Sequence, residues 1–316
     1  MFKKESIETI KPKESPISPE TLELAEKLHL QEQWEEQVRT LNETGIIELL
    51  PKFQDIGIVD INGKEQPIPT FEQILKSLDT KEQREMIKEK LEQGFTKLLM
   101  VPMGLPISII LDRYKRLLIK KHQEGKLLST DNEKLDLDEK EPIYLENPLS
   151  DQDIDSKLIY FPEQFNKQDH QGQTKQELIS QGNNWQVILV EDLADIPAEN
   201  KGKTIKSRKQ LEANQSPEQY LQTIQTDKTH QHEQAPTIES ELIYAISELK
   251  NKNQAIDDWQ GKGKGCWLFG NYLKDSGRVP DFSWDRDARR AGLGWSNPGN
   301  RSDRNGSRSG VKIFSK

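Results

Sequence analysis

The sequence predicts a mixed α+β protein, and three observations support this fold class. Segments in which apolar residues recur every three or four positions alternate with short extended runs. Serine followed by proline opens two of the helical segments, at Ser18 and Ser216, as a helix N-cap does. The 316 residues are 33% hydrophobic and 31% charged, which is compatible with a core if surface helices and loops carry the charge.

The N-terminal part predicts a leader and a small module. Residues 1–17 are rich in Pro, Lys, Glu and Ser, and we expect them to be disordered. Residues 18–41 have the spacing of one amphipathic helix. Asn62-Gly63 lies between short extended runs and predicts a β-hairpin. Residues 70–93 are helical again and are followed by glycine, so residues 18–93 are predicted to form a small α/β module.

The remaining residues, 94–316, are predicted to form a larger domain. Residues 95–101 are a continuous apolar run, which is typical of a buried strand. Residues 109–118 carry an apolar stripe against a basic face and predict a helix. The stretch NNWQVILVEDL, residues 183–193, predicts a strand at the centre of a sheet. The stretch TIESELIYAISELKNKN, residues 237–253, predicts another amphipathic helix.

The C-terminal end differs from the rest of the chain in composition. Residues 261–316 carry a net charge of +7, whereas residues 1–260 carry −15. Residues 259–316 also hold four of the six tryptophans. Disordered basic tails rarely contain so much tryptophan, so we expect this end to be folded.

An arginine-rich end can indicate nucleic-acid binding, because arginine neutralises phosphate. In this chain Asp285, Asp287 and Asp303 alternate with the arginines and would repel the same phosphates. We therefore do not expect nucleic acid as a partner.

The sequence gives no positive evidence of catalysis. The single cysteine, Cys266, excludes an internal disulfide and any zinc site built from several thiolates. Residues 261–265, GKGKG, lack the strand and the Lys-Ser/Thr pair that a phosphate-binding loop needs. His230 and His232 can in principle bind a metal, but a lone His-x-His in a polar loop is usually solvated. We expect no catalytic residue, no metal and no cofactor.

The location of the protein is predicted only from what the sequence lacks. The N-terminal lysines are not followed by an apolar segment of the kind found in signal peptides. No stretch approaches the roughly 20 apolar residues of a membrane span. A cytoplasmic location is therefore the expectation.

The order of motifs over most of residues 90–316 resembles the variable target proteins of bacterial diversity-generating retroelements, which have a C-type-lectin-like fold. The stretches that carry the resemblance are GFTKLLMVPMGLP, KLIYFPEQF, WQVILVEDL, SRKQLEANQSPEQYL and NQAIDDWQGKG, and above all the end of the chain. At that end the family-like positions are Val279-Pro280, Trp284, Arg286, Arg289, Ala291-x-Leu293, Pro298 and Gly306-x-Arg308-x-x-Val311-Lys312-Ile313.

The resemblance implies a non-enzymatic ligand-binding protein with a lectin-like domain over residues 94–316. In this family a reverse transcriptase copies a template repeat, substitutes at adenines and writes the copy into the 3′ end of the gene. The residues that change are displayed on a fixed frame, here over about residues 281–305. The implied ligand-binding residues, called the displayed residues below, are Asp285, Asp287, Gly292, Trp295, Ser296, Asn297, Gly299, Asn300, Ser302, Asp303 and Arg304. The implied framework residues are Trp284, Arg286, Arg289, Leu293, Pro298, Gly306 and Arg308.

The residue types agree with this interpretation, because Trp, Arg, Ser, Asn and Gly suit a recognition surface. The partner would be an unknown protein or another macromolecule. The calcium-site triplets of animal lectins, Glu-Pro-Asn and Trp-Asn-Asp, are absent, so no calcium is expected.

Three alternatives remain open at this point. The region can be a glycine-rich loop region of some other α+β domain. The chain can be an enzyme with the fold of formylglycine-generating or iron-dependent oxidases, although one cysteine and no two-His-one-carboxylate spacing argue against this. It can also be a scaffold that binds one fixed protein partner through its N-terminal module.

Overall fold

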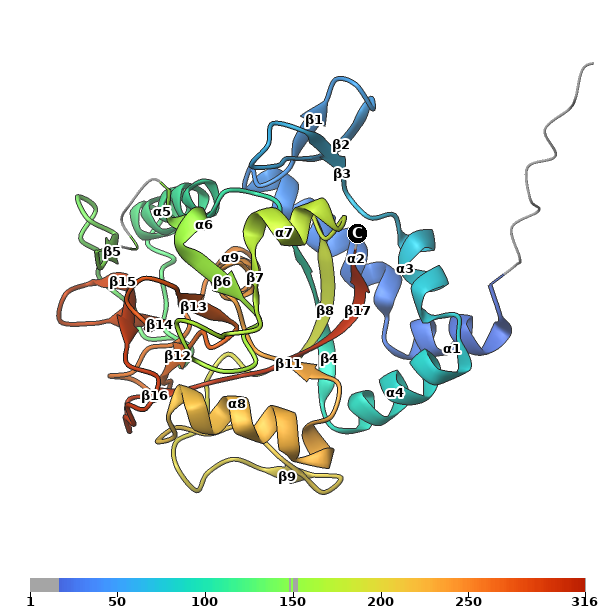
Figure 1. Ribbon diagram of the computed structural model, residues 1–316. Coiled ribbons are helices and arrows are strands. Elements are labelled where there is room, and N and C mark those ends of the chain that lie inside the picture. Colours follow the sequence, from blue (N-terminus) through green and yellow to red (C-terminus); the bar gives the residue numbers. More distant parts are fainter. Residues whose placement is uncertain (1–16, 148, 150–152, 316) are drawn as a thin grey trace, which may run out of the picture.

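The computed structural model describes residues 17–147, 149 and 153–315, and it is a mixed α+β protein with several small sheets (Figure 1). Apart from Ile17, the leader that we expect to be disordered lies outside the described residues. The helices are α1 (Pro19–Lys27), α2 (Leu30–Glu43), α3 (Phe71–Leu78), α4 (Lys81–Glu92), α5 (Ile107–Gln123), α6 (Ile154–Lys157), α7 (Lys175–Ser180), α8 (Pro217–Thr226), the 3-10 helix η1 (Lys228–His230) and α9 (Ile238–Lys252). The strands are β1 (Glu48–Leu50), β2 (Asp55–Val59), β3 (Glu65–Pro67), β4 (Phe95–Val101), β5 (Ile143–Leu145), β6 (Leu158–Tyr160), β7 (Gln173–Thr174), β8 (Gln186–Glu191), β9 (Thr204–Ile205), β10 (Arg208–Lys209), β11 (Glu233–Gln234), β12 (Gly265–Trp267), β13 (Asn271–Leu273), β14 (Val279–Asp285), β15 (Arg290–Ser296), β16 (Asn305–Gly306) and β17 (Gly310–Ser315).

A four-stranded antiparallel sheet forms the centre of the molecule, in the order β11-β17-β8-β4. The prediction of a central strand in residues 183–193 is confirmed, since β8 lies between β17 and β4 and all six of its residues are buried. The predicted strand over residues 95–101 is confirmed as β4. The end of the chain, β17, pairs with β8 and is thereby built into the core.

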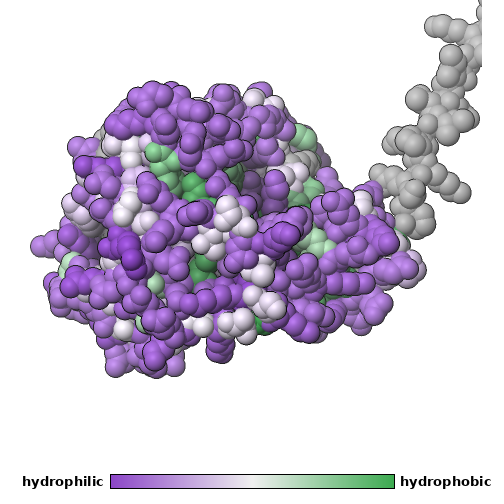
Figure 2. Space-filling view, turned by 60° about the horizontal axis from the view of Figure 1, so that its bottom comes forward, coloured by the Kyte–Doolittle hydropathy of each residue, from purple (hydrophilic) through white to green (hydrophobic). Residues whose placement is uncertain are grey.

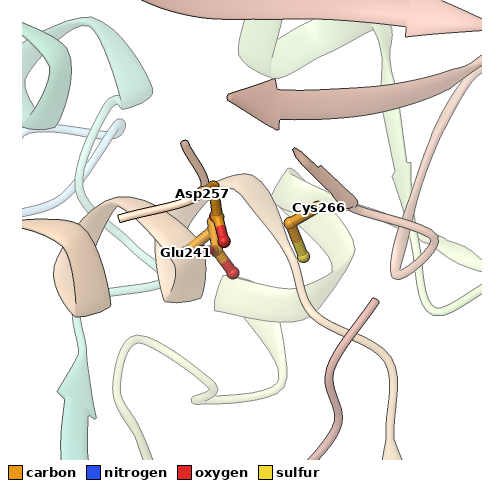
Figure 3. Close-up of side chains that lie close together, drawn as sticks. All are labelled: Glu241, Asp257 and Cys266. Carbon is orange, nitrogen blue, oxygen red and sulfur yellow. The ribbon is translucent and has the colours of Figure 1, made fainter. Parts of the chain in front are cut away.

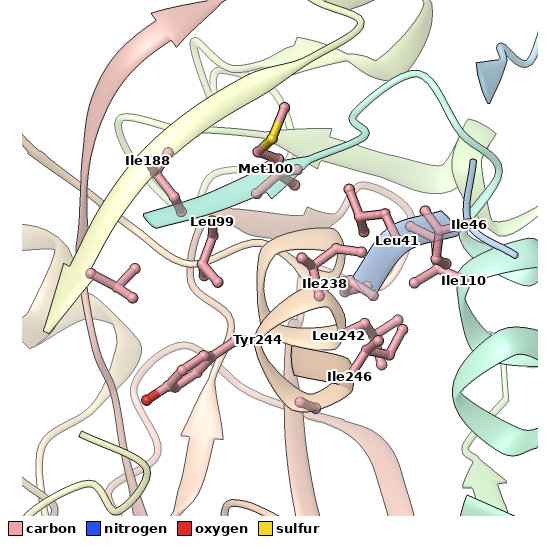
Figure 4. Packing of buried hydrophobic residues seen from close by; sticks show 14 of the residues in the cluster. Leu41, Ile46, Leu99, Met100, Ile110, Ile188, Ile238, Leu242, Tyr244 and Ile246 are labelled. Carbon is pink, nitrogen blue, oxygen red and sulfur yellow. The ribbon is translucent and has the colours of Figure 1, made fainter. Parts of the chain in front are cut away.

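Helix α9 lies beside this sheet, in contact with β4, α2 and α5. Figure 4 shows Leu242, Tyr244 and Ile246 of α9 among apolar side chains of neighbouring elements. The prediction that this helix is amphipathic is wrong, because every residue of Ile238–Leu249 is buried. Its glutamates are buried as well, and each is held by a cation from another part of the chain.

The predicted single helix over residues 18–41 is also wrong, because the structure divides it into α1 and α2 at His29, whose φ is +49°. Leu28 and Leu30 are both buried, at 3% and 1% exposure. On one straight helix two residues two positions apart point in nearly opposite directions. The break therefore allows both leucines to enter the core.

The N-terminal module and the larger domain share one hydrophobic cluster, which contains Leu41 and Ile87 from the module together with Leu98 and Ile313. The hairpin predicted at Asn62-Gly63 is confirmed by the antiparallel pairing of β2 and β3. The predicted boundary near residue 93 falls at the end of α4. There Gly94 has a φ of +102°, which glycine adopts without strain.

A second sheet carries the C-terminal region, in the order β16-β12-β14-β15-β5, and a third joins β13, β6 and β7. In Figure 1 the strands β12, β14, β15 and β16 of the second sheet lie on the opposite side of the central sheet from α1, α3 and α4. The face in Figure 2 is mostly hydrophilic, with hydrophobic residues in patches between hydrophilic ones. Among the described residues, no helix has both the length and the apolarity that crossing a bilayer requires.

Candidate functional site

The region around residues 281–305 is built on the antiparallel pair β14 and β15. Successive side chains of a strand point to opposite faces of the sheet. One face of this pair carries Phe282, Trp284 and Leu293, each about 1% exposed, into the core. The other face carries the partly exposed cross-strand pairs Asp285–Arg290, Ser283–Gly292 and Asp281–Gly294.

The outer face of β14 and β15 is loosely packed at Gly292. A Cβ added at Gly292 would meet only atoms of Ser283, at 3.9 Å. On the next strand, Tyr144 lies opposite Gly292 and is 43% exposed. The guanidinium of Arg290 lies 4.7 Å from the centre of the Tyr144 ring. A methyl group at position 292 can therefore be accommodated without displacing a neighbour.

None of the eleven displayed residues is buried. Six of them are exposed, namely Asp287, Asn297, Gly299, Asn300, Asp303 and Arg304. Trp295 differs from the rest, because it lies on the core-facing side of β15 and packs against the main cluster. Its Nε1 donates to the carbonyl oxygen of Asn147 at 2.8 Å, and the guanidinium of Arg278 stacks 3.3 Å from its ring centre. Only part of the Trp295 ring is open to solvent.

The loop between β15 and β16, residues 297–304, is held to the rest of the protein by backbone hydrogen bonds. The amide of Glu218, in the first turn of α8, donates to the carbonyl of Pro298 at 3.1 Å. The amide of Asn214 donates to the carbonyl of Ser302 at 3.1 Å, and that of Gly265 to Arg304 at 2.9 Å. The loop thus keeps its path without relying on most of its own side chains.

Two side chains of this loop do reach outside it. Arg301 donates to the carbonyl of Asn214 at 2.8 and 3.0 Å, beside a polar depression of about 430 Å³ along α8. Arg304 places its guanidinium 4.6 Å from the ring centre of Trp259. Both arginines are exposed, so these contacts contribute little to stability.

Two framework arginines hold buried carboxylates at the base of this region. Arg308 donates to Asp257 at 2.7 Å, to Glu241 and to the carbonyl of Ala194. Arg286 donates to Asp258 at 2.7 Å and reaches two more carboxylates in the segment 131–133. Burial raises the pKa of Asp258, and Arg286 opposes that rise. These pairs link distant segments of the chain to the strands that carry the displayed residues.

The other framework residues vary in their surroundings. Gly306 is buried, and a Cβ there would overlap Ile196. Pro298 is half-buried and accepts the hydrogen bond of α8 described above. Arg289 is exposed and bonds to Asp136 at 2.8 Å, which makes it the least enclosed member of the set.

Figure 3 shows Glu241, Asp257 and Cys266 pointing toward one another. Their ligand atoms lie within 4.8 Å of each other, and the described residues contain no other such group of three that could hold a metal. Burial raises the pKa of Asp257 well above its usual range, while Arg308 opposes this. Burial also raises the pKa of the Cys266 thiol, which disfavours the nucleophilic thiolate. Because Arg308 already binds both carboxylates, the arrangement is that of a structural ion pair.

His230 and His232 do not lie together in a metal site. His230 is buried, and its Nδ1 lies 3.1 Å from Glu233, whereas His232 is exposed. Arg208 and Lys90 also bind Glu233, at 2.7 and 2.8 Å. Burial opposes the ionisation of Glu233, but its hydrogen bonds to His230 and Arg208 outweigh this and lower its pKa to about 2. Sequence spacing does not reveal that Lys90 belongs to this cluster, because it is 143 positions from Glu233.

One further carboxyl group of the outer face has an unusual pKa. Burial raises the pKa of Asp281 to about 7, and the nearby charge of Glu146 adds to the rise. Both carboxylates lie beside Gly294, where a Cβ would meet Glu146 at 3.3 Å and Asp281 at 3.5 Å. The pattern of the sequence does not reveal this pair, because Glu146 follows β5 and is 135 positions before Asp281 in the chain.

Comparisons with family models, curated proteins and solved structures find no match to this chain.

Proposed function

We propose that this chain is a non-enzymatic ligand-binding protein with a lectin-like C-terminal domain. The ligand contacts the outer face of β14 and β15 together with the loop of residues 297–304. Adenine-directed retroelement mutagenesis diversifies that surface while the framework residues stay fixed. The partner is a protein or another macromolecule, because the surface is broad and has no deep enclosed pocket among its described residues.

The observation that carries the proposal is the separation of two kinds of position in one short segment. All eleven displayed residues keep solvent-accessible surface, whereas the framework residues Trp284, Leu293 and Gly306 are buried. The Arg308 side chain is only 10% exposed and is paired with two carboxylates. A segment that has to change its side chains without unfolding needs this division.

The chemistry of the region supports a binding role over an enzymatic one. Cys266 is fully buried, and its thiol has a raised pKa, so it is poorly suited to act as a nucleophile. The buried carboxylates beside it are engaged by Arg308. Neither group faces the open surface where a substrate would lie.

The decisive experiment is to sequence the DNA around the gene. The proposal predicts a near-copy of codons 281–313 that differs mainly where the copy has adenine, together with a reverse-transcriptase gene. Finding neither would overturn the retroelement part of the proposal.

A protein experiment tests the binding surface itself. One library randomises Asp287, Asn297, Asn300, Asp303 and Arg304, and a matched library randomises five buried residues of the same region. Yeast display with a protease challenge reports the folded fraction of each library. We expect the first library to stay folded and to yield binders to an arbitrary probe protein such as biotinylated lysozyme. Equal loss of folding in the two libraries would contradict the proposal.

A further inference from the structure

A groove in the N-terminal module has an apolar floor that no other element of the described residues covers. It lies between α1, α2 and α3 and has a volume of about 470 Å³. Leu22 and Ala25 of α1 and Phe71 and Leu75 of α3 line it at helical spacing. Leu22 is 49% exposed, one of few large apolar side chains that are so open among the described residues.

The rim of this groove is acidic. Glu26, Glu32 and Glu35 line it and are exposed, and none of its described lining residues is lysine or arginine. His29, at the break between α1 and α2, lies 3.4 Å from Glu32. An apolar floor with a negative rim attracts a ligand that combines apolar and positively charged groups.

The walls of the groove are fixed in place. Thr21 and Ser18, at the start of α1, donate to Asp79, which follows α3, and Arg84 binds the same carboxylate at 3.2 Å. On α2, the side-chain amide of Gln33 donates to the carbonyl of Thr96 and accepts from the amide of Leu98, both on β4 and both at 2.8 Å. A groove held at both ends loses little conformational entropy when a ligand binds.

We propose that this groove binds a basic amphipathic helix of a partner protein. Leu22 and Ala25 of α1 are spaced i, i+3, and Phe71 and Leu75 of α3 are spaced i, i+4, so each pair lies on the face of its helix that lines the groove, where an amphipathic helix can pack. Lysine or arginine on the flanks of that helix pairs with Glu26, Glu32 and Glu35. The site is distant in the fold from the displayed residues, and its function does not depend on theirs.

The test uses the full chain and a fluorescent model peptide built only from leucine and lysine at the amphipathic helical period. A scrambled peptide of the same composition and a leucine–glutamate peptide are the peptide controls. Fluorescence anisotropy at low and high salt measures binding. We expect saturable binding of the basic helix, weaker at high salt, and no comparable binding of the two controls.

Two variants assign the binding to the groove. Leu22→Asp places a charge on the floor and is expected to weaken binding about tenfold or more. The double variant Glu26→Gln, Glu35→Gln leaves the floor intact and is expected to weaken binding at low salt and to reduce its dependence on salt. Leu49→Asp is the matched control, because Leu49 is also exposed, at 68%, but lies on β1 outside the groove.

Several results would overturn the proposal. One is equal binding of the basic peptide to the Leu22→Asp variant and the parent chain, while thermal melting shows both folded. Another is equal binding of the scrambled or acidic peptide. A third is a concentration-dependent dimer in sedimentation that Leu22→Asp dissociates, since the occupant would then be a second copy of this chain.

Discussion

Replacing Arg308 with alanine is expected to destabilise the protein far more than replacing Arg304 with alanine. The Arg308 side chain is 10% exposed and binds Asp257 and Glu241, which are 0% and 1% exposed. Removing one partner of a buried ion pair leaves uncompensated charge and costs about 3–5 kcal/mol. For a chain of this size about 1 kcal/mol lowers the melting temperature by about 2 °C, so we expect a decrease of about 6–10 °C.

The Arg304 variant loses only an exposed contact with the Trp259 ring. Such a contact contributes about 0.5–1 kcal/mol, which corresponds to about 1–2 °C. Melting curves followed by circular dichroism at the same protein concentration compare the two variants. Equal decreases would refute the distinction between framework and displayed residues.

The effect of the Arg308→Ala variant should also depend on pH. In the native chain Arg308 lowers the pKa of Asp257 against the raising effect of burial. Without the guanidinium this pKa rises further, and a carboxyl group with a raised folded-state pKa loses stability as pH rises. The difference in free energy of unfolding between the parent and the Arg308→Ala variant should therefore be larger at pH 8 than at pH 5. The double variant with Asp257→Asn should recover part of the loss, because it removes the unpaired charge.

Three further predictions concern single positions of the same region. Gly306→Ala should lower the free energy of unfolding by about 1–3 kcal/mol through overpacking, because its Cβ would overlap Ile196. Gly292→Ala should change it by no more than about 0.5 kcal/mol. Urea unfolding compares the two variants, and a larger loss for Gly292→Ala would contradict the packing. The pKa of Asp281 is raised to about 7, so its contribution to stability is present below pH 4 and is lost as pH rises through 7. The difference in free energy of unfolding between the Asp281→Asn variant and the parent should therefore favour the variant more at pH 8 than at pH 5, by about 1–2 kcal/mol after allowance for the partial solvent exposure of Asp281. The same difference at both pH values would contradict this. The Cys266 thiol should not react with a thiol reagent in the native protein but should react in denaturant, and rapid native labelling would contradict its burial.

The sequence predicts the elements of the core better than it predicts their surroundings. A continuous apolar run predicts β4 and the central strand β8, because a strand buried on both faces has apolar side chains at successive positions. Helical periodicity led to a wrong prediction for α9, because its glutamates indicate a solvent-exposed face that the structure does not have. Glu239, Glu241 and Glu248 are instead held by Lys175, Arg308 and Lys97, from 64, 67 and 151 positions away. Sequence periodicity does not reveal pairings over such distances.

The candidate site shows the same limit. Alternation along β14 and β15 explains why Trp284 and Leu293 are buried and why Ser283 and Gly292 are not. The place of Trp295 depends on Arg278 and on the carbonyl of Asn147, a residue on a segment far away in the sequence. Trp295 follows Ala291 and Leu293 at every second position, so alternation places it on the core-facing side of β15. Only its pairing with Arg278 and Asn147 requires knowledge of the tertiary packing.

The way the loop of residues 297–304 is anchored bears on whether this surface can vary. Most loops depend on particular side chains for their shape, so changing those side chains changes the loop. This loop is held to the rest of the protein by the backbone amides of Asn214, Glu218 and Gly265, which donate to backbone carbonyls of the loop and so do not use its side chains. The chain directly after the loop is held in place by the ion pairs of Arg308 with buried carboxylates and by the close packing of Gly306. A fixed backbone path with replaceable side chains is the physical condition for diversification, whether evolution or a library supplies the changes.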